Sequence, residues 1–265
     1  MRRPAGLTMT QRLWDHRDLV VSLVRRQYQV RYRQSFIGIV WAVAPPLFML
    51  AAATLVFDVV ARVDTGRTSY PMFAFAALAP WTFLANALTF GVPSITLDQQ
   101  MVTRLPFPRA ALPLSMLGAS LVDLVIASGV FVVFAYATGN TLPVTAAWYP
   151  ALLLIEIALA AGIVLLGSAM NVFARDIRQA VPLLVQMWLF LTPVLYPLGA
   201  VPVEFRRWYQ LNPMTGLVES FRRVLLDGDA PDPSMLLSPI LGALVGLVVG
   251  VWYFAVTEKR FADVI

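Results

Sequence analysis

Residues 146–173 read AAWYPALLLIEIALAAGIVLLGSAMNVF, and this stretch decides the fold class of the chain. Its only charged side chain is Glu156, and a bilayer core about 30 Å thick is crossed by about 20 mostly apolar helical residues. Five further stretches are long and apolar in the same way, at residues 37–57, 72–95, 112–138, 181–201 and 235–256. They are too long and too uniformly apolar for membrane β-strands. The sequence therefore predicts an all-α polytopic membrane protein with six transmembrane helices.

The composition indicates the same class of protein. Of the 265 residues, 59% are hydrophobic and 13% are charged, whereas a soluble domain has about 45–50% and about 25%. A soluble fold of this size cannot hide so much apolar surface. Soluble enzymes and disordered chains are therefore excluded.

Missing residue types exclude several kinds of active site. The chain has no cysteine and a single histidine, His16, so we expect no disulfide and no metal site. The only lysine, Lys259, follows no glycine-rich turn, so the phosphate-binding loop of an ATPase is missing. We therefore expect no catalytic residue in this chain, and ATP would have to be bound by a separate chain.

The placement of arginine and lysine predicts the orientation. With the N-terminus in the cytoplasm, most of these residues fall on the cytoplasmic side of the six spans, as the positive-inside rule requires. An even number of spans then returns the C-terminus to the cytoplasm.

A basic amphipathic helix is expected in the segment 10–34, before the first span. On a helical wheel, its apolar side is formed by Leu13, Trp14, Val20, Val21, Val24 and Tyr28. Leu19 and Leu23 do not fit this side. Such a helix is expected to lie in the membrane plane with its arginines on anionic head groups. It is either a general anchor or a contact for a partner subunit.

The cytoplasmic connector at residues 97–110 combines a short helix with a stiff exit. Asp98 can cap the helix, and Pro106 and Pro108 force an extended backbone after it. Phe107 is thereby presented between Arg104 and Arg109. The connector is either a rigid knob that transmits force from a soluble partner or a loop that merely avoids helix.

The segment 202–233, outside the membrane, is too long for an ordinary loop. Two short helices fit its pattern, at residues 203–211 and 215–226. The first is ended by Asn212 and Pro213, and the second by Asp227 and Gly228. We expect a re-entrant hairpin or an interfacial lid.

Asp123 and Glu156 lie near the middle of the third and fourth spans, where carboxylates are costly. Because the spans contain no basic residue, these groups are expected to be protonated or to hydrogen-bond with serine, threonine or tyrosine side chains, such as those of Ser120 and Ser128. Polar contact between helices is favoured over a wet translocation path. The sixth span contains three glycines spaced by four, Gly242, Gly246 and Gly250. They are expected to form a stripe along one side of the helix that permits close packing against another helix.

Four aromatic residues lie away from the ends of their spans: Trp41, Phe48, Trp188 and Tyr196. Their flat apolar faces could stack on sugar rings. For any single one of them, contact with lipid is the alternative.

Four stretches together resemble one family. They are YRQSFIGIVWAVAPPLFM at 32–49, TRLPFPRAALPL at 103–114, NVFARDIRQAVPLLVQMWLFLTPVLYP at 171–197, and NPMTGLVESFRRVL at 212–225. The chain resembles the permease subunit of bacterial ABC exporters for surface polysaccharides such as O-antigen and teichoic acid. The resemblance implies a homodimer in the bacterial inner membrane with both termini in the cytoplasm. It also implies two copies of a separate ATPase subunit that holds ATP and Mg, a lipid-linked polysaccharide as substrate, contact with membrane lipids, and no nucleic acid.

The resemblance also implies roles for particular residues. Those coupling the chain to the ATPase would be Arg104, Phe107, Pro108 and Arg109 of the connector, with Arg25 and Arg26 of the amphipathic helix. The glycan channel would be lined by Trp41, Phe48, Trp188 and Tyr196. Arg175 and Asp176 would form a structural or gating ion pair, with Asp123 and Glu156 as further gating or structural charges. The external gate would contain Glu204, Trp208, Asn212, Glu219 and Phe221. One departure is the run Arg104, Leu105, Pro106, where family members often have a lysine or a bulkier stretch.

Two other functions fit parts of the sequence. An exporter of a drug or a small lipid would share the membrane architecture but would have a smooth lipid cleft in place of aromatic stacking surfaces. A membrane-embedded glycosyl- or phosphotransferase would need acidic and polar groups clustered at one membrane face, whereas the sequence scatters them.

Overall fold

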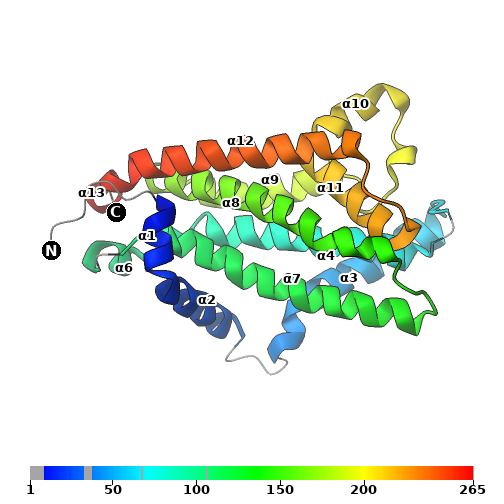
Figure 1. Cartoon of the computed structure of the whole chain (residues 1–265), viewed down its shortest axis with the longest axis horizontal. Helices are drawn as coiled ribbons and strands as arrows, with labels where there is room; N and C mark the ends of the chain where they lie inside the picture. The colour runs from blue at the N-terminus through cyan, green and yellow to red at the C-terminus, as the bar shows by residue number, and fades with distance from the viewer. Residues whose placement is uncertain (1–8, 33–37, 67, 106, 265) are drawn as a thin grey trace.

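The computed structural model describes residues 9–32, 38–66, 68–105 and 107–264, and the regular structure in these ranges is helical. Within these ranges, four helices are long and apolar enough to cross a membrane, and they lie side by side along the molecule (Figure 1). They are α4 (Tyr70–Gly91), α7 (Ala111–Ala137), α8 (Tyr149–Phe173) and α12 (Pro233–Thr257). Most residues of α4 are buried, so this helix forms the centre of the main apolar core. The predicted all-helical, multi-span class is therefore found.

The stretches expected as the first and fifth spans form shorter helices. The first begins as a 3₁₀ turn, η1 (Gly38–Ala42), and continues as α3 (Ala44–Ala53) and a π turn, η2 (Thr54–Val60). The two prolines of α3 lie in its first turn. The N–H groups of a first turn have no partner within the helix, so the N–H groups that proline lacks cost no hydrogen bond there.

The fifth stretch forms α9 (Ile177–Phe190), so the helix ends well before residue 201. Residues 191–197, which include Pro193 and Pro197, form turns and bends without a helix. Proline lacks an N–H donor and collides with the preceding helical turn, which explains why the helix stops here.

The N-terminal amphipathic helix packs on protein. It consists of α1 (Met9–Asp15) and α2 (Arg17–Tyr32), and α2 packs along α7. Leu23 is buried, although it lies off the expected apolar side, whereas Trp14 and Val21 are exposed. The expected face is therefore partly wrong, because the position of α7 selects the buried side.

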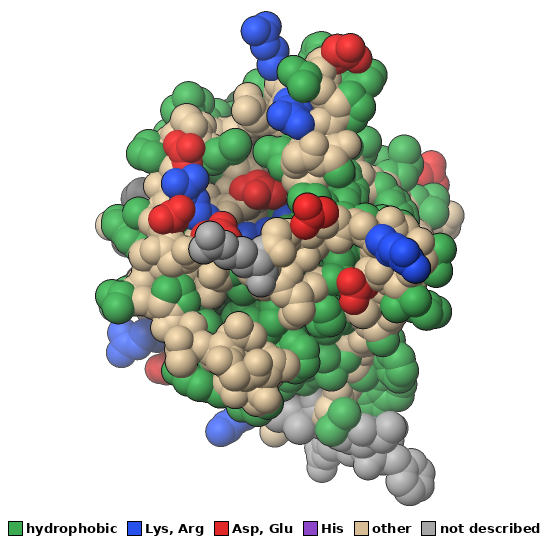
Figure 2. Space-filling view, turned by 90° about the vertical axis from the view of Figure 1, so that its right-hand side faces the viewer, with side chains coloured by type: hydrophobic (Ala, Val, Ile, Leu, Met, Phe, Trp, Pro, Cys, Tyr) green, Lys and Arg blue, Asp and Glu red, His purple; other side chains and the backbone are tan. Residues whose placement is uncertain are grey.

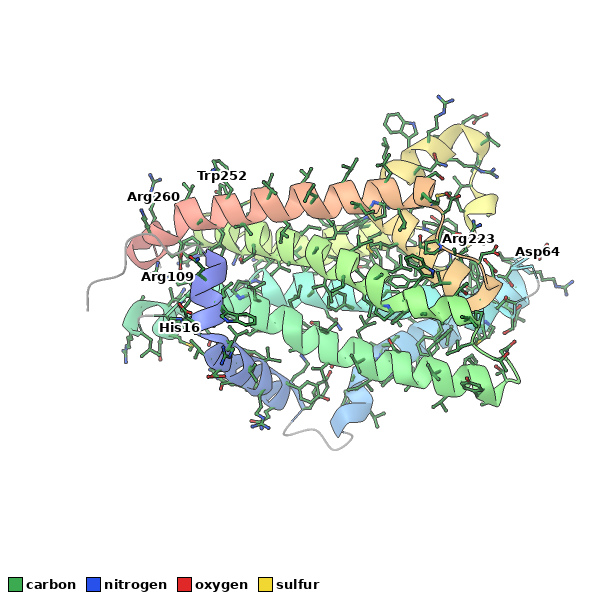
Figure 3. The ribbon with its side chains drawn as sticks, viewed as in Figure 1. His16, Asp64, Arg109, Arg223, Trp252 and Arg260 are labelled. Carbon is green, nitrogen blue, oxygen red and sulfur yellow. The ribbon has the colours of Figure 1, made fainter. Side chains whose placement is uncertain are left out.

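The two ends of the bundle carry different small elements (Figure 1). One end, here named the connector end, contains the short elements α5 (Ser94–Leu97), α6 (Gln99–Arg104), η6 (Glu258–Arg260) and α13 (Phe261–Val264). The opposite end, the gate end, contains η3 (Val144–Trp148), η4 (Leu198–Ala200), α10 (Val203–Leu211), α11 (Pro213–Arg222) and η5 (Arg223–Asp227). Arg109 and Arg260 mark the connector end, and Asp64 and Arg223 mark the gate end (Figure 3).

Glycines bring α8 and α12 into close contact. A Cβ on Gly162 of α8 would overlap the backbone of Gly246, and a Cβ on Gly250 would overlap the carbonyl of Gly162. A Cβ on Gly246 itself would meet no atom within 4 Å. The expected glycine stripe therefore packs against α8 within this chain, but its members are not equivalent.

We predict that Gly162→Ala and Gly250→Ala lower the stability of the purified protein by about 1–3 kcal/mol, because an added methyl group must push the two helices apart. Gly246→Ala is the matched control and should leave the melting temperature in detergent unchanged. Equal melting temperatures for all three variants would contradict this packing.

Candidate functional site

The amphipathic helix is linked to the connector by a charge pair. The Arg26 guanidinium lies 3.5 Å from a carboxylate oxygen of Asp98, and it also approaches the sulfur of Met101 at 3.8 Å. Asp98 occupies the position before α6, but its side chain makes no capping bond. The expected cap is therefore wrong, and the Asp98 carboxylate joins α2 to the connector instead.

The connector is also tied to the end of α12. The backbone N–H of Arg109 donates to Oε1 of Glu258 at 3.2 Å, and the Arg109 guanidinium donates to the Glu258 carbonyl. Phe107 packs half-buried against the apolar cluster at this end, in which Phe254 and Phe261 meet edge to face with ring centroids 5.3 Å apart. Sequence reasoning assigned no role to Glu258, which lies 149 residues beyond Arg109 in the chain.

The predicted coupling residues thus fall into two groups. Arg26, Phe107 and Arg109 make contacts inside the chain, and Pro108 is half-buried. Arg25 and Arg104 are exposed, as is Arg26 despite its pairing with Asp98. Leu105, which is 54% exposed, extends the surface that Arg104 offers to a partner.

Asp123 of α7 is neutralised by the amphipathic helix. Arg31 Nη1 lies 2.6 Å from one carboxylate oxygen, and the Tyr32 hydroxyl donates to the other at 2.9 Å. The Arg31 guanidinium also lies over the ring of Phe90, 4.3 Å from its centroid. Burial and the Asp123 carboxylate raise the pKa of Tyr32 to about 12, so its hydroxyl remains a donor at neutral pH.

The expected tyrosine partner of Asp123 is found in Tyr32, whereas the two serines that were named are wrong. Ser120 donates to the Met116 carbonyl, and Ser128 bonds within its helix and to Tyr149. The basic partner comes from outside the spans, which is why a search within the spans missed it.

Glu156 of α8 is fully buried. Within the described part of the chain, neither of its carboxylate oxygens has a hydrogen-bond partner. Its surroundings are those of an apolar helix interface.

The four predicted channel aromatics differ in their surroundings. Trp41 and Phe48 are 46% and 71% exposed. Trp188 packs edge-on against Trp81 with ring centroids 5.9 Å apart. The Tyr196 hydroxyl donates to the Phe190 carbonyl at 2.6 Å. Trp188 and Tyr196 therefore have contacts that stabilise the fold, whereas Trp41 and Phe48 are exposed.

Arg175 and Asp176 lie in the turn that leads into α9, and both are exposed. Among the residues that the structure describes, no ion pair forms between them. The expected pairing is therefore not found within a single chain.

Asn212 organises the turn between α10 and α11. Its side-chain oxygen accepts from the Met214 N–H at 3.1 Å and from Trp188 Nε1 at 2.9 Å. Its amide nitrogen donates to the Thr192 hydroxyl at 2.9 Å and to the Leu191 carbonyl at 3.1 Å. Asn212 therefore caps α11 and fastens the gate segment to the end of α9.

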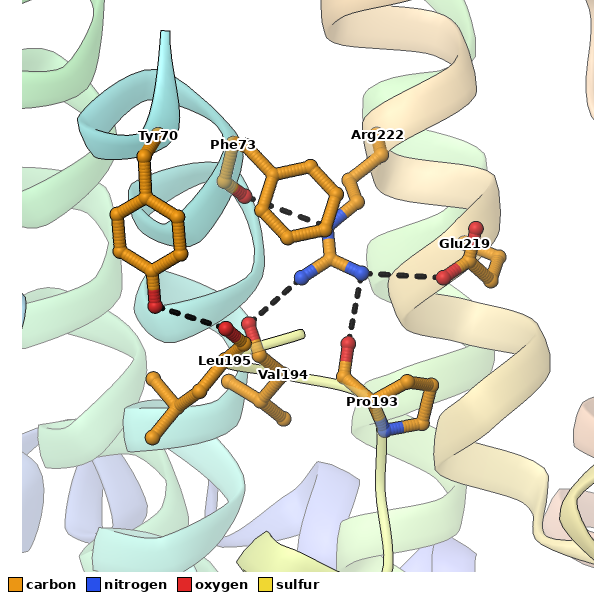
Figure 4. A network of polar contacts seen from close by, with 7 residues as sticks. All are labelled: Tyr70, Phe73, Pro193, Val194, Leu195, Glu219 and Arg222. Atoms are coloured by element: carbon orange, nitrogen blue, oxygen red, sulfur yellow. Dashed lines mark hydrogen bonds and ion pairs between the residues drawn. The ribbon is translucent and has the colours of Figure 1, made fainter. Parts of the chain in front are cut away.

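Arg222 forms the densest polar contact of the gate end (Figure 4). Its guanidinium donates to the carbonyls of Phe73 at 3.2 Å, Pro193 at 2.6 Å and Val194 at 2.6 Å, and to the Glu219 carboxylate at 3.0 Å. The guanidinium carbon lies over the Phe73 ring, 3.6 Å from its centroid. Burial lowers the pKa of Arg222 to about 10, so the side chain remains positively charged at neutral pH.

Sequence reasoning placed Glu219 at the gate but missed Arg222. The signal that could have found it is the spacing of three between Glu219 and Arg222, which brings both to one side of a helix. The remaining predicted gate residues are placed differently. Phe221 is buried against Tyr149, whereas Glu204 and Trp208 of α10 are exposed.

The outer face of the gate end is hollowed near its centre, and acidic and basic side chains gather around the hollow (Figure 2). α11 is enclosed by α4, α8 and α12, while α10 projects beyond the bundle (Figure 1). The gate end therefore has a fixed inner helix and a projecting outer one.

We predict that Arg222→Ala lowers the free energy of unfolding by about 3–5 kcal/mol, because it leaves buried carbonyls and a carboxylate without their donor. Arg223→Ala is the matched control. Its side chain is 43% exposed and pairs with Asp229 at 3.7 Å, so its loss should cost about 1 kcal/mol or less. Thermal unfolding in detergent measures both, and similar losses would contradict the assigned role of Arg222.

Comparison with known proteins places this arrangement among transport proteins. The chain is 29% identical to the O-antigen export system permease protein RfbA of Myxococcus xanthus, over 97% of this chain and 99% of the relative. It is 27% identical to the RfbA protein of Klebsiella pneumoniae, over 94% and 95% of the two chains. It is 20% identical to the polysialic acid transport protein KpsM of Escherichia coli, over 91% and 93%.

The profile of the ABC-2 type transporters matches residues 18–226, which include the connector, the span α7 and the gate helices. The resemblance inferred from four short stretches is confirmed by this match. The chain therefore belongs to the ABC-2 type transporter family, as a membrane permease.

Proposed function

We propose that this chain is the permease subunit of an ATP-driven exporter that moves a lipid-linked polysaccharide, of O-antigen or capsular type, outward across the bacterial cytoplasmic membrane. The near full-length similarity to O-antigen export permeases supports the substrate class. The exporter is a homodimer of this chain with two copies of an ATPase subunit, which bind ATP and Mg. The chain itself breaks no bond of the substrate.

The observation that carries this proposal is the construction of the connector end. Arg26 joins the amphipathic helix to Asp98, and Arg109 joins the connector to Glu258 at the end of α12. A displacement of the connector is thereby transmitted to α2, α7 and α12. Arg104 and Leu105 project from this unit and form the surface on which an ATPase docks.

In this proposal both termini are cytoplasmic, and the connector end faces the ATPase. The short helices α3 with η2 and α9 complete the six spans, and the gate end faces outward. The polysaccharide passes beside Trp41 and Phe48, whose exposed ring faces can stack on sugars. Arg175 and Asp176 lie close to the cytoplasmic surface, where a second copy or the ATPase supplies their partners.

We predict that the double change Arg104→Glu with Leu105→Asp uncouples the exporter. A reversed charge and a lost apolar contact weaken docking without disturbing the core, because both side chains are exposed. Polysaccharide export and retention of the ATPase subunit during purification should each fall at least about fivefold, which is about 1 kcal/mol.

The matched control is Arg207→Glu, an exposed arginine of α10 at the opposite end. It should leave retention of the ATPase unchanged. Normal export and normal retention in the connector variant would refute docking at this surface.

We also predict that Trp41→Ala and Phe48→Ala reduce polysaccharide export while the protein remains assembled. Trp188→Ala should instead lower the melting temperature, because it removes a hydrogen bond to Asn212 and an edge contact with Trp81. Export is measured as polymer on the cell surface, and assembly as retention of the ATPase.

The control for these variants is Trp252→Ala. Trp252 is 64% exposed on α12 and points away from the bundle (Figure 3), so its loss should change neither measurement. If export persists at the normal rate in both the Trp41 and the Phe48 variants, sugar stacking on these rings is wrong. Export of a small lipid in place of the polymer would favour the lipid exporter.

A further inference from the structure

A cavity of about 250 Å³ lies between α4, α7, the start of α8 and η5. Most of its walls are apolar, and two hydroxyl groups, of Ser128 and Tyr149, also line it. The apolar lining includes Phe75, Ala76 and Ala79 of α4, Gly129 and Phe131 of α7, and Leu225 of η5. Neither the glycan channel aromatics nor the coupling residues line it. It is therefore a separate feature of the bundle.

The two hydroxyl groups beside the cavity already use their hydrogen atoms. The Ser128 hydroxyl donates to the Leu124 carbonyl at 2.8 Å, and the Tyr149 hydroxyl can then donate to Ser128 at 2.8 Å. A buried water needs about two to four polar partners, and apolar cavities stay dry. The cavity therefore favours an apolar occupant over water.

The cavity lies at the depth of the hydrocarbon layer. Gly129 precedes the last residue of α7, Ala137, by eight positions, which is about 12 Å at about 1.5 Å per residue. A helix of 27 residues is about 40 Å long and exceeds a bilayer core of about 30 Å. The molecules that surround the cavity in the membrane are therefore lipid chains.

Gly129 provides an opening toward the lipid. This residue is exposed, and a Cβ built on it would meet no atom within 4 Å. The inner wall is closed to the surface, since Phe75, Ala76 and Ala79 are 0%, 2% and 4% exposed. A chain that contacts these α4 residues must have entered the cavity.

We propose that this cavity is a binding site for the hydrocarbon chain of a lipid. Its volume exceeds the roughly 150 Å³ of an apolar cavity that accommodates benzene, so it can hold the end of a chain. One wall belongs to η5, and the Thr145 hydroxyl donates to the Val224 carbonyl at 2.9 Å beside that wall. An inserted chain therefore contacts the segment that follows gate helix α11.

The test uses the purified transporter complex in lipid nanodiscs. One sample contains a phospholipid with a photoreactive diazirine at the end of an acyl chain, and a second contains a polyprenyl phosphate with the diazirine at the end of its tail. After illumination, mass spectrometry maps the labelled residues. We expect label on Phe75, Ala76 or Ala79 in at least one sample. The sample that gives it distinguishes a membrane phospholipid from a polyprenyl carrier.

Gly129→Leu should reduce this label at least fivefold, because the new side chain fills the opening. Gly246→Leu is the matched control, since its Cβ also meets no atom within 4 Å but lies on α12. It should leave the label unchanged. Ala146→Leu, which fills the cavity from η3, provides a second blocking variant if the first fails to fold. Melting temperature and retention of the ATPase report on folding.

Two results would overturn the proposal. In the first, label is confined to residues that face the surrounding lipid, such as Trp252, in both samples. In the second, label on α4 persists in a folded variant whose cavity is blocked.

Discussion

Arg222 is the residue on which the gate end depends. Pro193 ends α9 early, and the carbonyls of residues 193–195 then have no partners in a helix. Val194, Leu195 and Arg222 are buried, and buried backbone carbonyls must find donors within the protein. Arg222 supplies donors to the carbonyls of Pro193 and Val194, and the Tyr70 hydroxyl donates to that of Leu195 at 2.7 Å. The break in the helix and the buried arginine therefore belong to one arrangement, which joins α4, α9 and α11.

The same constraint shapes the other half of the molecule. Asp123 lies in an apolar helix, and the charge that neutralises it comes from Arg31 of the amphipathic helix. The buried Arg31–Asp123 pair therefore fixes the C-terminal end of α2 to α7, and Arg26 fixes α2 to the connector. Glu156 shows the alternative, because its carboxyl group is buried among apolar side chains with no described hydrogen-bond partner.

Local signals predicted much of this fold, and contacts between distant segments account for what they missed. Length and hydropathy were sufficient for α4, α7, α8 and α12, and Asn212, Pro213 and Gly228 marked the gate helices correctly. The buried side of α2 could not be predicted, because it is set by the position of α7. Arg31 and Arg222 were counted as ordinary surface charges, since their partners lie 92 and up to 149 residues away in the chain.

The strengths of these links indicate how motion passes through the permease. The Arg26–Asp98 pair is partly exposed and 3.5 Å long, and such pairs contribute about 1 kcal/mol or less. The Arg222 contacts are buried, and removing one partner from such a group costs about 3–5 kcal/mol. A displacement that begins at the connector therefore rearranges its own weak contacts before it can break those of the gate end. In the proposed exporter, we therefore expect α11, the turn at residues 191–197 and the start of α4 to move together as one rigid unit.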